Sequence, residues 1–233
     1  MTSKNEFSRR SLVKVGAAAA AAGVAALAVP PWAQASPSKE LSVILADVPT
    51  LSSRDAQAEA EKAEVRRRQF GFLVKARHCV NCQACVRSCR RHNETPAGAP
   101  ARRKVTVYRS DGAEDVYLST SCMHCVEPAC VAVCPAGAIV KGDGGLVTVQ
   151  PERCIGCKYC YQACPFGVPA YNKVSMDKCD GCQGNGVPLG EDPWCVRACK
   201  FDALHFGPLD DLRNADEGAQ VVEASTKPAF VLA

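Results

Sequence analysis

The sequence predicts an α+β fold of short helices, hairpins and loops that is held together at its cysteines. Only 6% of the 233 residues are aromatic, whereas 16 are cysteine, so the apolar core is lean and the thiols must compensate for it. Short alternating apolar segments flank Gly-rich turns, which is typical of hairpins. The cysteines recur with constant spacing, which indicates a repeated binding site.

The central stretch of the chain is residues 154–165, with the spacing C-x2-C-x2-C-x3-C-P. This is the bacterial-ferredoxin run for a [4Fe–4S] cluster. Three thiolates on one tight loop can reach three corners of a cube, and the fourth lies where the chain leaves the loop as a helix. In two-cluster ferredoxins that fourth cysteine ligates the other cluster, so the run predicts a partner motif. We expect Pro165 in the first turn of the helix, where its missing N–H costs nothing.

The cysteines form four groups of four. Every group opens C-x2-C and closes C-x3-C, and the middle gap is two residues in groups one and three, four in group two and twelve in group four. Group one is Cys79, Cys82, Cys85 and Cys89; group two is Cys122, Cys125, Cys130 and Cys134; group three is Cys154, Cys157, Cys160 and Cys164; group four is Cys179, Cys182, Cys195 and Cys199.

Three chemistries could use these thiols. Disulfides are compatible with the even count, but cysteines spaced so closely would bridge poorly. Zinc uses C-x2-C pairs, yet it does not explain the triple runs or the Cys-Pro endings. Iron–sulfur clusters explain both, and the 16 thiolates divide into four [4Fe–4S] clusters with none left over.

The ends of the groups indicate which groups belong together. Groups two and three end in Cys-Pro, at Pro135 and Pro165, whereas groups one and four continue with Arg90 and Lys200. This asymmetry predicts that group two pairs with group three and group one with group four. The long gap of group four, residues 183–194, is rich in Gly and Pro and predicts a surface loop.

Residues 1–35 have the features of a twin-arginine export signal. Arg9 and Arg10 precede an apolar run, and Ala33-Gln34-Ala35 forms a small-x-small cleavage site, which would leave a mature chain from Ser36. Because this route carries folded proteins, it favours a metal site built before export. We expect a location in the periplasm or at the outer face of the cytoplasmic membrane, held there by partners. An uncleaved anchor is the alternative, but a span needs about 20 residues.

The other elements follow in chain order. Residues 36–69 predict a linker and then a surface helix from residue 52 to 68, and residues 70–76 predict a strand that leads to Cys79. Hairpin strands are predicted at 105–108 and 116–119, around Asp111-Gly112, and at 139–140 and 146–149, around residues 142–145. The tail, residues 214–233, is polar and then apolar, and its pattern predicts no structure.

Three stretches resemble the four-cluster electron-transfer subunits of molybdenum oxidoreductases, in particular the dimethyl sulfoxide reductase branch. Residues 121–130 resemble that family's C-x-H-C-x-x-P-x-C segment, residues 154–167 its central ferredoxin run, and residues 203–213 the ending seen in that branch. The resemblance spans about residues 72–213.

This resemblance implies two interleaved ferredoxin-like halves within residues 70–213, an outer half of residues 70–110 plus 171–213 and an inner half of residues 111–170. It also implies four [4Fe–4S] clusters, because Cys160, which the nitrate reductase branch replaces, is present. The implied ligand sets are Cys79, Cys82, Cys85 and Cys199; Cys179, Cys182, Cys195 and Cys89; Cys122, Cys125, Cys130 and Cys164; and Cys154, Cys157, Cys160 and Cys134.

The implied function is an electron-transfer subunit with no catalytic residues and no small-molecule substrate of its own. It would relay electrons, in either direction, between a quinol-linked membrane subunit or a cytochrome and a molybdopterin catalytic subunit of an anaerobic respiratory complex. Formate dehydrogenase, hydrogenase and polysulfide, thiosulfate or tetrathionate reductase complexes are alternatives. A different class is an exported binding protein stapled by zinc or disulfides. The net charge of +4 does not favour nucleic acid.

Other polar and aromatic residues near the cysteines are interpreted as neighbours of the clusters. The basic residues around group one could raise a cluster potential, dock an acidic partner or form a solvated face; they are Arg77, Arg87, Arg90, Arg91, Arg102 and Arg103. The histidines are expected beside clusters or on the surface, at positions His78, His92, His124 and His205. Tyr159, Tyr161 and Trp194 are expected to shield clusters.

Overall fold

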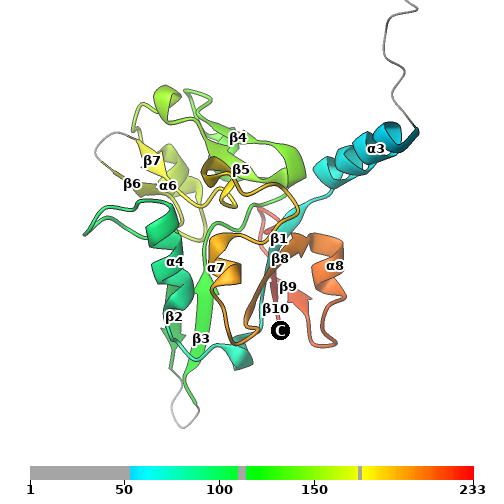
Figure 1. Cartoon of the computed structure of the whole chain (residues 1–233). Helices are drawn as coiled ribbons and strands as arrows, with labels where there is room; N and C mark the ends of the chain where they lie inside the picture. Colours follow the sequence, from blue (N-terminus) through cyan, green and yellow to red (C-terminus); the bar gives the residue numbers. More distant parts are fainter. Residues whose placement is uncertain (1–52, 110–113, 173–174) are drawn as a thin grey trace, which may run out of the picture. The chain divides into compact units, whose positions relative to one another are not determined.

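The structure is a computed structural model that describes residues 53–109, 114–172 and 175–233. The expected export signal, the linker and the Asp111-Gly112 turn lie outside the described residues. Short helices and short strands alternate along the chain (Figure 1), as the predicted α+β class requires. Within the described ranges, no helix is long and apolar enough to cross a membrane.

The described elements are short, and only one of the described helices exceeds three turns. The helices are α3 (Ser53–Arg67), α4 (Ala84–His92), α5 (Ala129–Ala132), α6 (Tyr159–Ala163), α7 (Trp194–Arg197) and α8 (Leu209–Arg213). The strands are β1 (Phe70–Val74), β2 (Lys104–Tyr108), β3 (Val116–Thr120), β4 (Ile139–Lys141), β5 (Val147–Val149), β6 (Ala170–Tyr171), β7 (Met176–Asp177), β8 (Leu204–Pro208), β9 (Gln220–Val221) and β10 (Phe230–Leu232). Single 3-10 turns are η2 (Ala76–His78), η3 (Asp143–Gly145), η4 (Pro151–Arg153) and η5 (Gln183–Asn185).

The largest sheet has the strand order β8-β1-β10-β9. Strand β1 is an apolar run, and all five of its residues are buried. It pairs antiparallel with β8 and parallel with β10, so Phe72 lies between Phe206 and Phe230. Glycine is required at position 71, because a Cβ there would lie 2.0 Å from the carbonyl oxygen of Ala229.

The C-terminal tail supplies strands β9 and β10, although its sequence predicts no structure. Ala229, Phe230 and Val231 are at most 1% exposed, and the N–H of Ala229 donates to the carbonyl oxygen of Met123 at 2.9 Å. A three-residue strand that pairs with β1, so far away in the sequence, leaves no local pattern, because its stability comes from burial against distant residues. The tail therefore completes the sheet that begins at β1.

Most local predictions are confirmed. Helix α3 is present at the predicted position, and its residues from 55 onward are exposed or half-buried. The two predicted hairpins are β2–β3 and β4–β5, both antiparallel and within one residue of the expected bounds. The gap of group four is a largely exposed loop that begins with η5 and ends at α7.

The expected position of Pro165 is wrong. Helix α6 begins at Tyr159, directly after the left-handed residue Lys158 (φ 65°), and it ends before Cys164, whose backbone is extended. Pro165 follows the helix and does not start it. The physical reason is that the proline ring disfavours helical φ/ψ at the preceding residue, so the Cys-Pro step stops the helix. Pro135 likewise follows α5.

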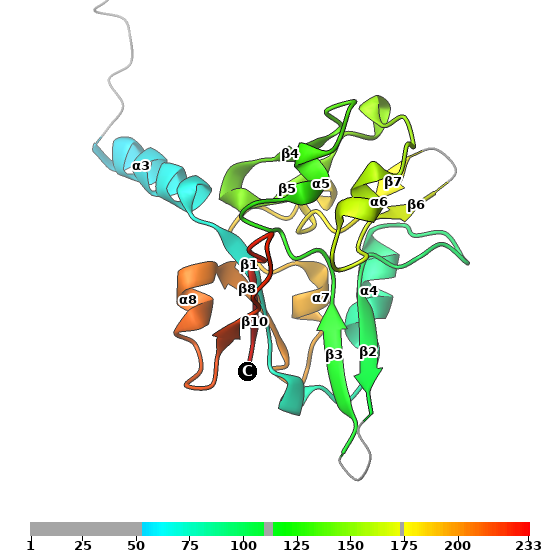
Figure 2. The same cartoon turned by 180° about the vertical axis from the view of Figure 1, so that it is seen from behind.

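The helices that carry the third cysteines of the groups pack in pairs. Helix α4 of group one contacts α7 of group four, and α5 of group two contacts α6 of group three. Figure 1 shows α4 beside α7, and Figure 2 shows α5 beside α6. The fold therefore brings together the groups that the Cys-Pro asymmetry associates.

Candidate metal centres

All sixteen cysteines lie in the described residues and carry free thiols. Only Cys82 and Cys157 are exposed, and the others are buried or half-buried. Burial raises the pKa of an unpaired thiol, because the thiolate loses its hydration. Thiolates in such positions need a metal or a nearby cation to stabilise them.

The four groups share one backbone turn directly before their second cysteine. The residue there is left-handed in every group, with φ of 56° at Asn81, 42° at His124, 69° at Gly156 and 69° at Gly181. Such a turn directs main-chain N–H groups towards one concave site, which favours an anion. Glycine and asparagine adopt it most readily, so three positions carry a residue type that the turn favours and His124 is the exception.

Two pockets each gather four thiols from two groups. One pocket is lined by three cysteines of group one and the last of group four, namely Cys79, Cys82, Cys85 and Cys199. The other is lined by three cysteines of group three and the last of group two, namely Cys154, Cys157, Cys160 and Cys134. In both pockets the fourth thiol comes from the partner group.

The other eight thiols meet in the same way. Burial, followed by the nearby thiol of Cys195, raises the pKa of Cys89 to about 12. Burial, followed by the thiols of Cys122 and Cys164, raises the pKa of Cys130 to about 12. Cys89 of group one therefore lies with group four, beside Cys182, Cys195 and, through Cys195, Cys179. Cys164 of group three lies with group two, beside Cys122, Cys125 and Cys130.

The donor atoms fit [4Fe–4S] clusters. The thiols of two sets line one pocket each, and among the described residues no three His, Cys, Asp or Glu side chains are placed to hold a single metal ion. Main-chain N–H groups point at sulfur: Ala138 donates to Cys134 Sγ at 3.3 Å, and Met176 donates to Cys154 Sγ at 3.4 Å. Hydrogen bonds to sulfur are one of the means by which proteins tune such clusters.

Comparison with known proteins points to the same chemistry. Residues 72–135 and residues 113–209 each match a family model described as a 4Fe-4S dicluster domain. The sequence is 41% identical over 157 residues to the B subunit of anaerobic dimethyl sulfoxide reductase of Escherichia coli (strain K12), which covers 62% of this protein and 76% of that subunit. This protein belongs to the dimethyl sulfoxide reductase-type iron–sulfur subunits.

Two further relatives are similar at slightly lower identity. The iron–sulfur subunit is 38% identical over 150 residues to the thiosulfate reductase electron transfer subunit PhsB of Salmonella typhi, covering 61% of its own length and 78% of PhsB. It is 37% identical over 152 residues to Protein NrfC of Escherichia coli (strain K12), covering 61% and 67%. It is therefore a non-catalytic, [4Fe–4S]-binding electron-transfer subunit of an oxidoreductase complex, and it has a catalytic partner.

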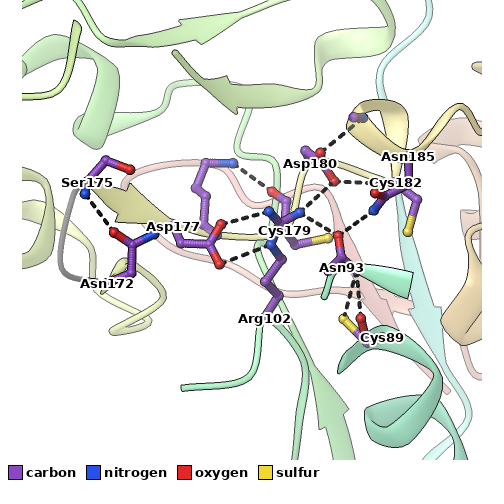
Figure 3. A network of polar contacts seen from close by, with 12 residues as sticks. Cys89, Asn93, Arg102, Asn172, Ser175, Asp177, Cys179, Asp180, Cys182 and Asn185 are labelled. Atoms are coloured by element: carbon purple, nitrogen blue, oxygen red, sulfur yellow. Dashed lines mark hydrogen bonds and ion pairs between the residues drawn. The ribbon is translucent and has the colours of Figure 1, made fainter. Parts of the chain in front are cut away.

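A polar network surrounds the thiols of group four in the iron–sulfur subunit (Figure 3). Arg102 forms ion pairs with Asp177 at 2.8 Å and with Asp180 at 3.3 Å. Arg102 Nη1 also donates to Asn93 Oδ1 at 2.6 Å, and the amide of Asn93 donates to the carbonyl oxygen of Cys89 at 2.8 Å. The charge of Arg102 is therefore balanced by two carboxylates, and its contacts connect the segments that carry groups one and four.

Two cations lie buried among the cysteines. Arg103 is 1% exposed and Lys178 is 4% exposed. Lys178 Nζ donates to the carbonyl oxygen of Cys179 at 2.8 Å. Arg77, Arg87 and Arg91 are exposed, as either a solvated face or a docking face requires, whereas the buried Arg103 belongs to neither. Lys178 is not among the residues predicted from the sequence, although a lysine directly before a cysteine of group four is the signal that could have identified it.

The histidines and aromatic residues divide between core and surface. His124 is fully buried, and its Nδ1 accepts the N–H of Val147 at 3.0 Å, so the ring is neutral; burial, followed by Lys178, holds its pKa well below the ordinary value. Trp194 stacks on His92 at a centroid distance of 4.0 Å.

Tyr159 and Tyr161 are at least 50% exposed, so the expectation that they shield a cluster stays a prediction. The tyrosine that reaches a thiol is Tyr171, whose hydroxyl lies 3.0 Å from Cys160 Sγ. Its signal in the sequence is weak, since it lies seven residues beyond the nearest cysteine, Cys164, and reaches a thiol at an earlier position.

Proposed function

We propose that the iron–sulfur subunit holds four [4Fe–4S] clusters and relays single electrons along them. The ligand sets are those expected from the resemblance. The two outer sets are Cys79, Cys82, Cys85 and Cys199, and Cys179, Cys182, Cys195 and Cys89; the two inner sets are Cys122, Cys125, Cys130 and Cys164, and Cys154, Cys157, Cys160 and Cys134. The observation that supports them is the exchange of the fourth thiol between groups one and four, whose helices α4 and α7 pack together, and between groups two and three, whose helices α5 and α6 pack together.

The contacts between sets favour a single path. Cys85 and Cys89 lie one turn apart on α4 and belong to the two different outer sets. Cys179 of the second outer set and Cys122 of an inner set are close enough for their charges to interact. The two inner sets share α5 and α6, which contact each other. The four sets therefore form a single electron path in the order in which they are named above.

When bound, the clusters supply one-electron redox chemistry, and the residues of the protein hold them, insulate them and set their potentials. The thiolates fix the positions, and the apolar side chains around them, such as Leu204 in the first pocket and Ile139 in the last, exclude water. No residue of this protein takes part in breaking or forming a bond of a substrate.

We propose a molybdopterin catalytic subunit at one end of the path, and a membrane subunit linked to quinol, or a cytochrome, at the other. The relatives named for dimethyl sulfoxide and thiosulfate reductases support a complex of this kind. Either of these reductions, or that of a related small oxidant, is then the reaction served. The paired Arg9 and Arg10 support export by the twin-arginine route to the periplasmic side of the membrane.

Purification without oxygen tests the cluster count. We expect a brown protein with about 16 iron atoms and as much acid-labile sulfide per polypeptide, four of each for every cube. Redox titration followed by EPR should resolve four separate one-electron clusters. A colourless protein, or one with zinc or with disulfides between its cysteines, would overturn the proposal, and iron for fewer than four clusters would overturn the ligand sets.

A further inference from the structure

Arg103 is the most deeply buried cation of the described residues, and it lies among neutral partners. Its side chain is 1% exposed, and its guanidinium carbon lies 4.5 Å from the centroid of the Phe72 ring. Its Nη atoms donate to the hydroxyl of Ser119 at 3.1 Å and to that of Ser121 at 2.9 Å. The neighbouring Arg102 pairs with two carboxylates, whereas none of the ion pairs among the described residues includes Arg103.

A buried charge without a counter-charge is costly, so something must balance this one. Burial disfavours the charged guanidinium, yet the pKa of Arg103 is raised above its ordinary value. The groups that favour the cation are thiols, in the order Cys195, Cys179, Cys85 and Cys89. These four cysteines belong to both outer sets. The counter-charge of Arg103 therefore comes from the cysteines that would hold two different clusters.

The distances connect Arg103 to both outer sets. The hydroxyl of Ser119, which accepts from Arg103, lies 3.4 Å from Cys85 Sγ of the first set. For the second set, Arg103 lies over the ring of Phe72, and Phe72 belongs to the same core cluster as Cys89, Cys179 and Cys195. Only one side chain lies between the guanidinium and the first set, and the field of the guanidinium reaches the thiols of the second.

We propose that Arg103 is a potential-setting residue shared by the two outer clusters, and that its fixed positive charge raises both of their reduction potentials together. This rests on the ligand sets proposed above. Reduction adds one negative charge to a cluster, and a cation in a medium of low dielectric constant favours that gain much more than it would in water. Because the site is buried, salt screens this effect little. Arg103 thus shifts both outer clusters in the same direction, relative to the inner clusters.

The test removes the charge and measures potentials in the cluster-loaded protein. In Arg103→Met, two of the four EPR-resolved clusters should shift downwards, with the reduced-to-oxidised ratio at a fixed potential falling at least tenfold, or about 59 mV for one electron. Arg103→Lys keeps the charge and should retain most of both potentials. Arg91→Met removes an exposed cation two residues from Cys89 and is the matched control, with all potentials unchanged.

Cysteine variants assign the shifted EPR signals to the outer clusters. A second neutral variant distinguishes a change in potential from a failure to fold or to load clusters. The two shifted signals must be those lost in Cys85→Ser and in Cys195→Ser. Arg103→Gln keeps amide donors towards Ser119 and Ser121 and is the second neutral variant. If both neutral variants lose only the outer clusters while Arg103→Lys keeps all four, this result also supports the proposal, because the outer clusters then need the charge of Arg103.

Three results would overturn the proposal: unchanged potentials in a neutral variant with full iron, an equal shift of all four clusters, or loss of clusters in Arg103→Lys as well. Iron content in the unmodified protein below four clusters would instead count against the ligand sets, so the two failures are distinguishable.

Discussion

The outer and the inner sets of thiols are surrounded in different ways. Of the eight outer thiols, five are buried, and all of these except Cys182 pack in the same apolar core as strands β1 and β8; of the eight inner thiols, only two are buried. The outer sets lie beside Arg102 and the buried Arg103. The inner sets lie beside Tyr171 and beside main-chain N–H groups such as that of Ala138. Both halves provide groups that stabilise negative sulfur: buried cations in the outer half, and hydrogen bonds at more exposed thiols in the inner half.

This difference follows from where the sheet lies. Strand β1 delivers the polypeptide to group one and β8 leaves group four, so the outer thiols share the core of the sheet. A cluster in such a core loses solvation, and a buried cation is an effective replacement. The inner groups lie between short hairpins, where a smaller apolar cluster around Ile139 leaves more contact with water. Lys178 lies between the halves, since it follows Asp177 of the outer network and favours the thiolate of Cys130.

The largest expected effect is the loss of a whole cluster. It tests whether groups two and three, which form the inner half, exchange their fourth thiols with each other. Cys164→Ser and Cys122→Ser should abolish the same EPR signal, and Cys160→Ser and Cys134→Ser should abolish a different one, each with about a quarter of the iron. No cluster needs to be assigned beforehand, because the comparison is between pairs of variants. If Cys164→Ser and Cys160→Ser lost the same signal, the crossed ligand sets would be wrong.

A core substitution should affect the outer half more than the inner half. Phe230→Ala leaves a cavity beside Phe72 and should lower the free energy of unfolding by about 3–5 kcal/mol. Ile155→Ala, at a residue that is 69% exposed beside an inner set, should change it by less than about 0.5 kcal/mol. Denaturant-induced loss of cluster absorbance measures both. Equal effects would mean that the tail does not stabilise the outer sets.

The sequence predicts which cysteine groups pack together, because their spacings and end residues reflect local geometry. The constant C-x2-C and C-x3-C spacings, the Cys-Pro endings of groups two and three, and the glycines at 156 and 181 all follow from local reach and local turns. Hairpins and the exposed helix α3 are local too, and their alternation or composition is sufficient to predict them.

What the sequence does not reveal depends on partners that are distant in the sequence. Strand β10 pairs with β1 through three residues only, and Arg103 is buried because the sheet and the outer thiols meet around it. Arg102 and Arg103 are adjacent residues of the same type, and only the fold gives the first two carboxylates and the second none. The expected position of Pro165 is wrong because a proline suits both the start and the end of a helix, and the extended Cys164 decides between them.

A smaller effect tests the hydrogen bonds of the inner half. Tyr171→Phe removes the hydroxyl that lies 3.0 Å from Cys160 Sγ. A hydrogen bond is worth about 0.5–1.5 kcal/mol net, so the potential of the cluster lost in Cys160→Ser should fall by roughly 20–60 mV. Redox titration measures the shift. Tyr159→Phe, at an exposed ring, is the control and should have no effect. An equal shift in both variants would show that the hydroxyl of Tyr171 does not tune the potential of this cluster.

The smallest effect concerns the exposed charges of the outer half, which should contribute little in contrast to Arg103. Asp202 is 62% exposed and lies 2.9 Å from Lys75 Nζ. The hydrogen bond from Lys75 lowers the pKa of Asp202 below its ordinary value of 3.8. Because the pKa of Asp202 is lower in the folded protein, its ionised form stabilises the folded state at pH values above the ordinary pKa. This contribution is lost as the pH falls through the lowered pKa.

Near neutral pH, Asp202→Asn should therefore cost about 0.2–1 kcal/mol, since the pair is exposed. The cost should shrink further in 1 M salt, where the Debye length is about 3 Å. Denaturant unfolding at low and high salt measures it, with Asp210→Asn as the control at a longer and more exposed pair. A loss that persisted in high salt would show that surface charge, too, contributes to the outer half, and the contrast between buried and exposed cations would then fail.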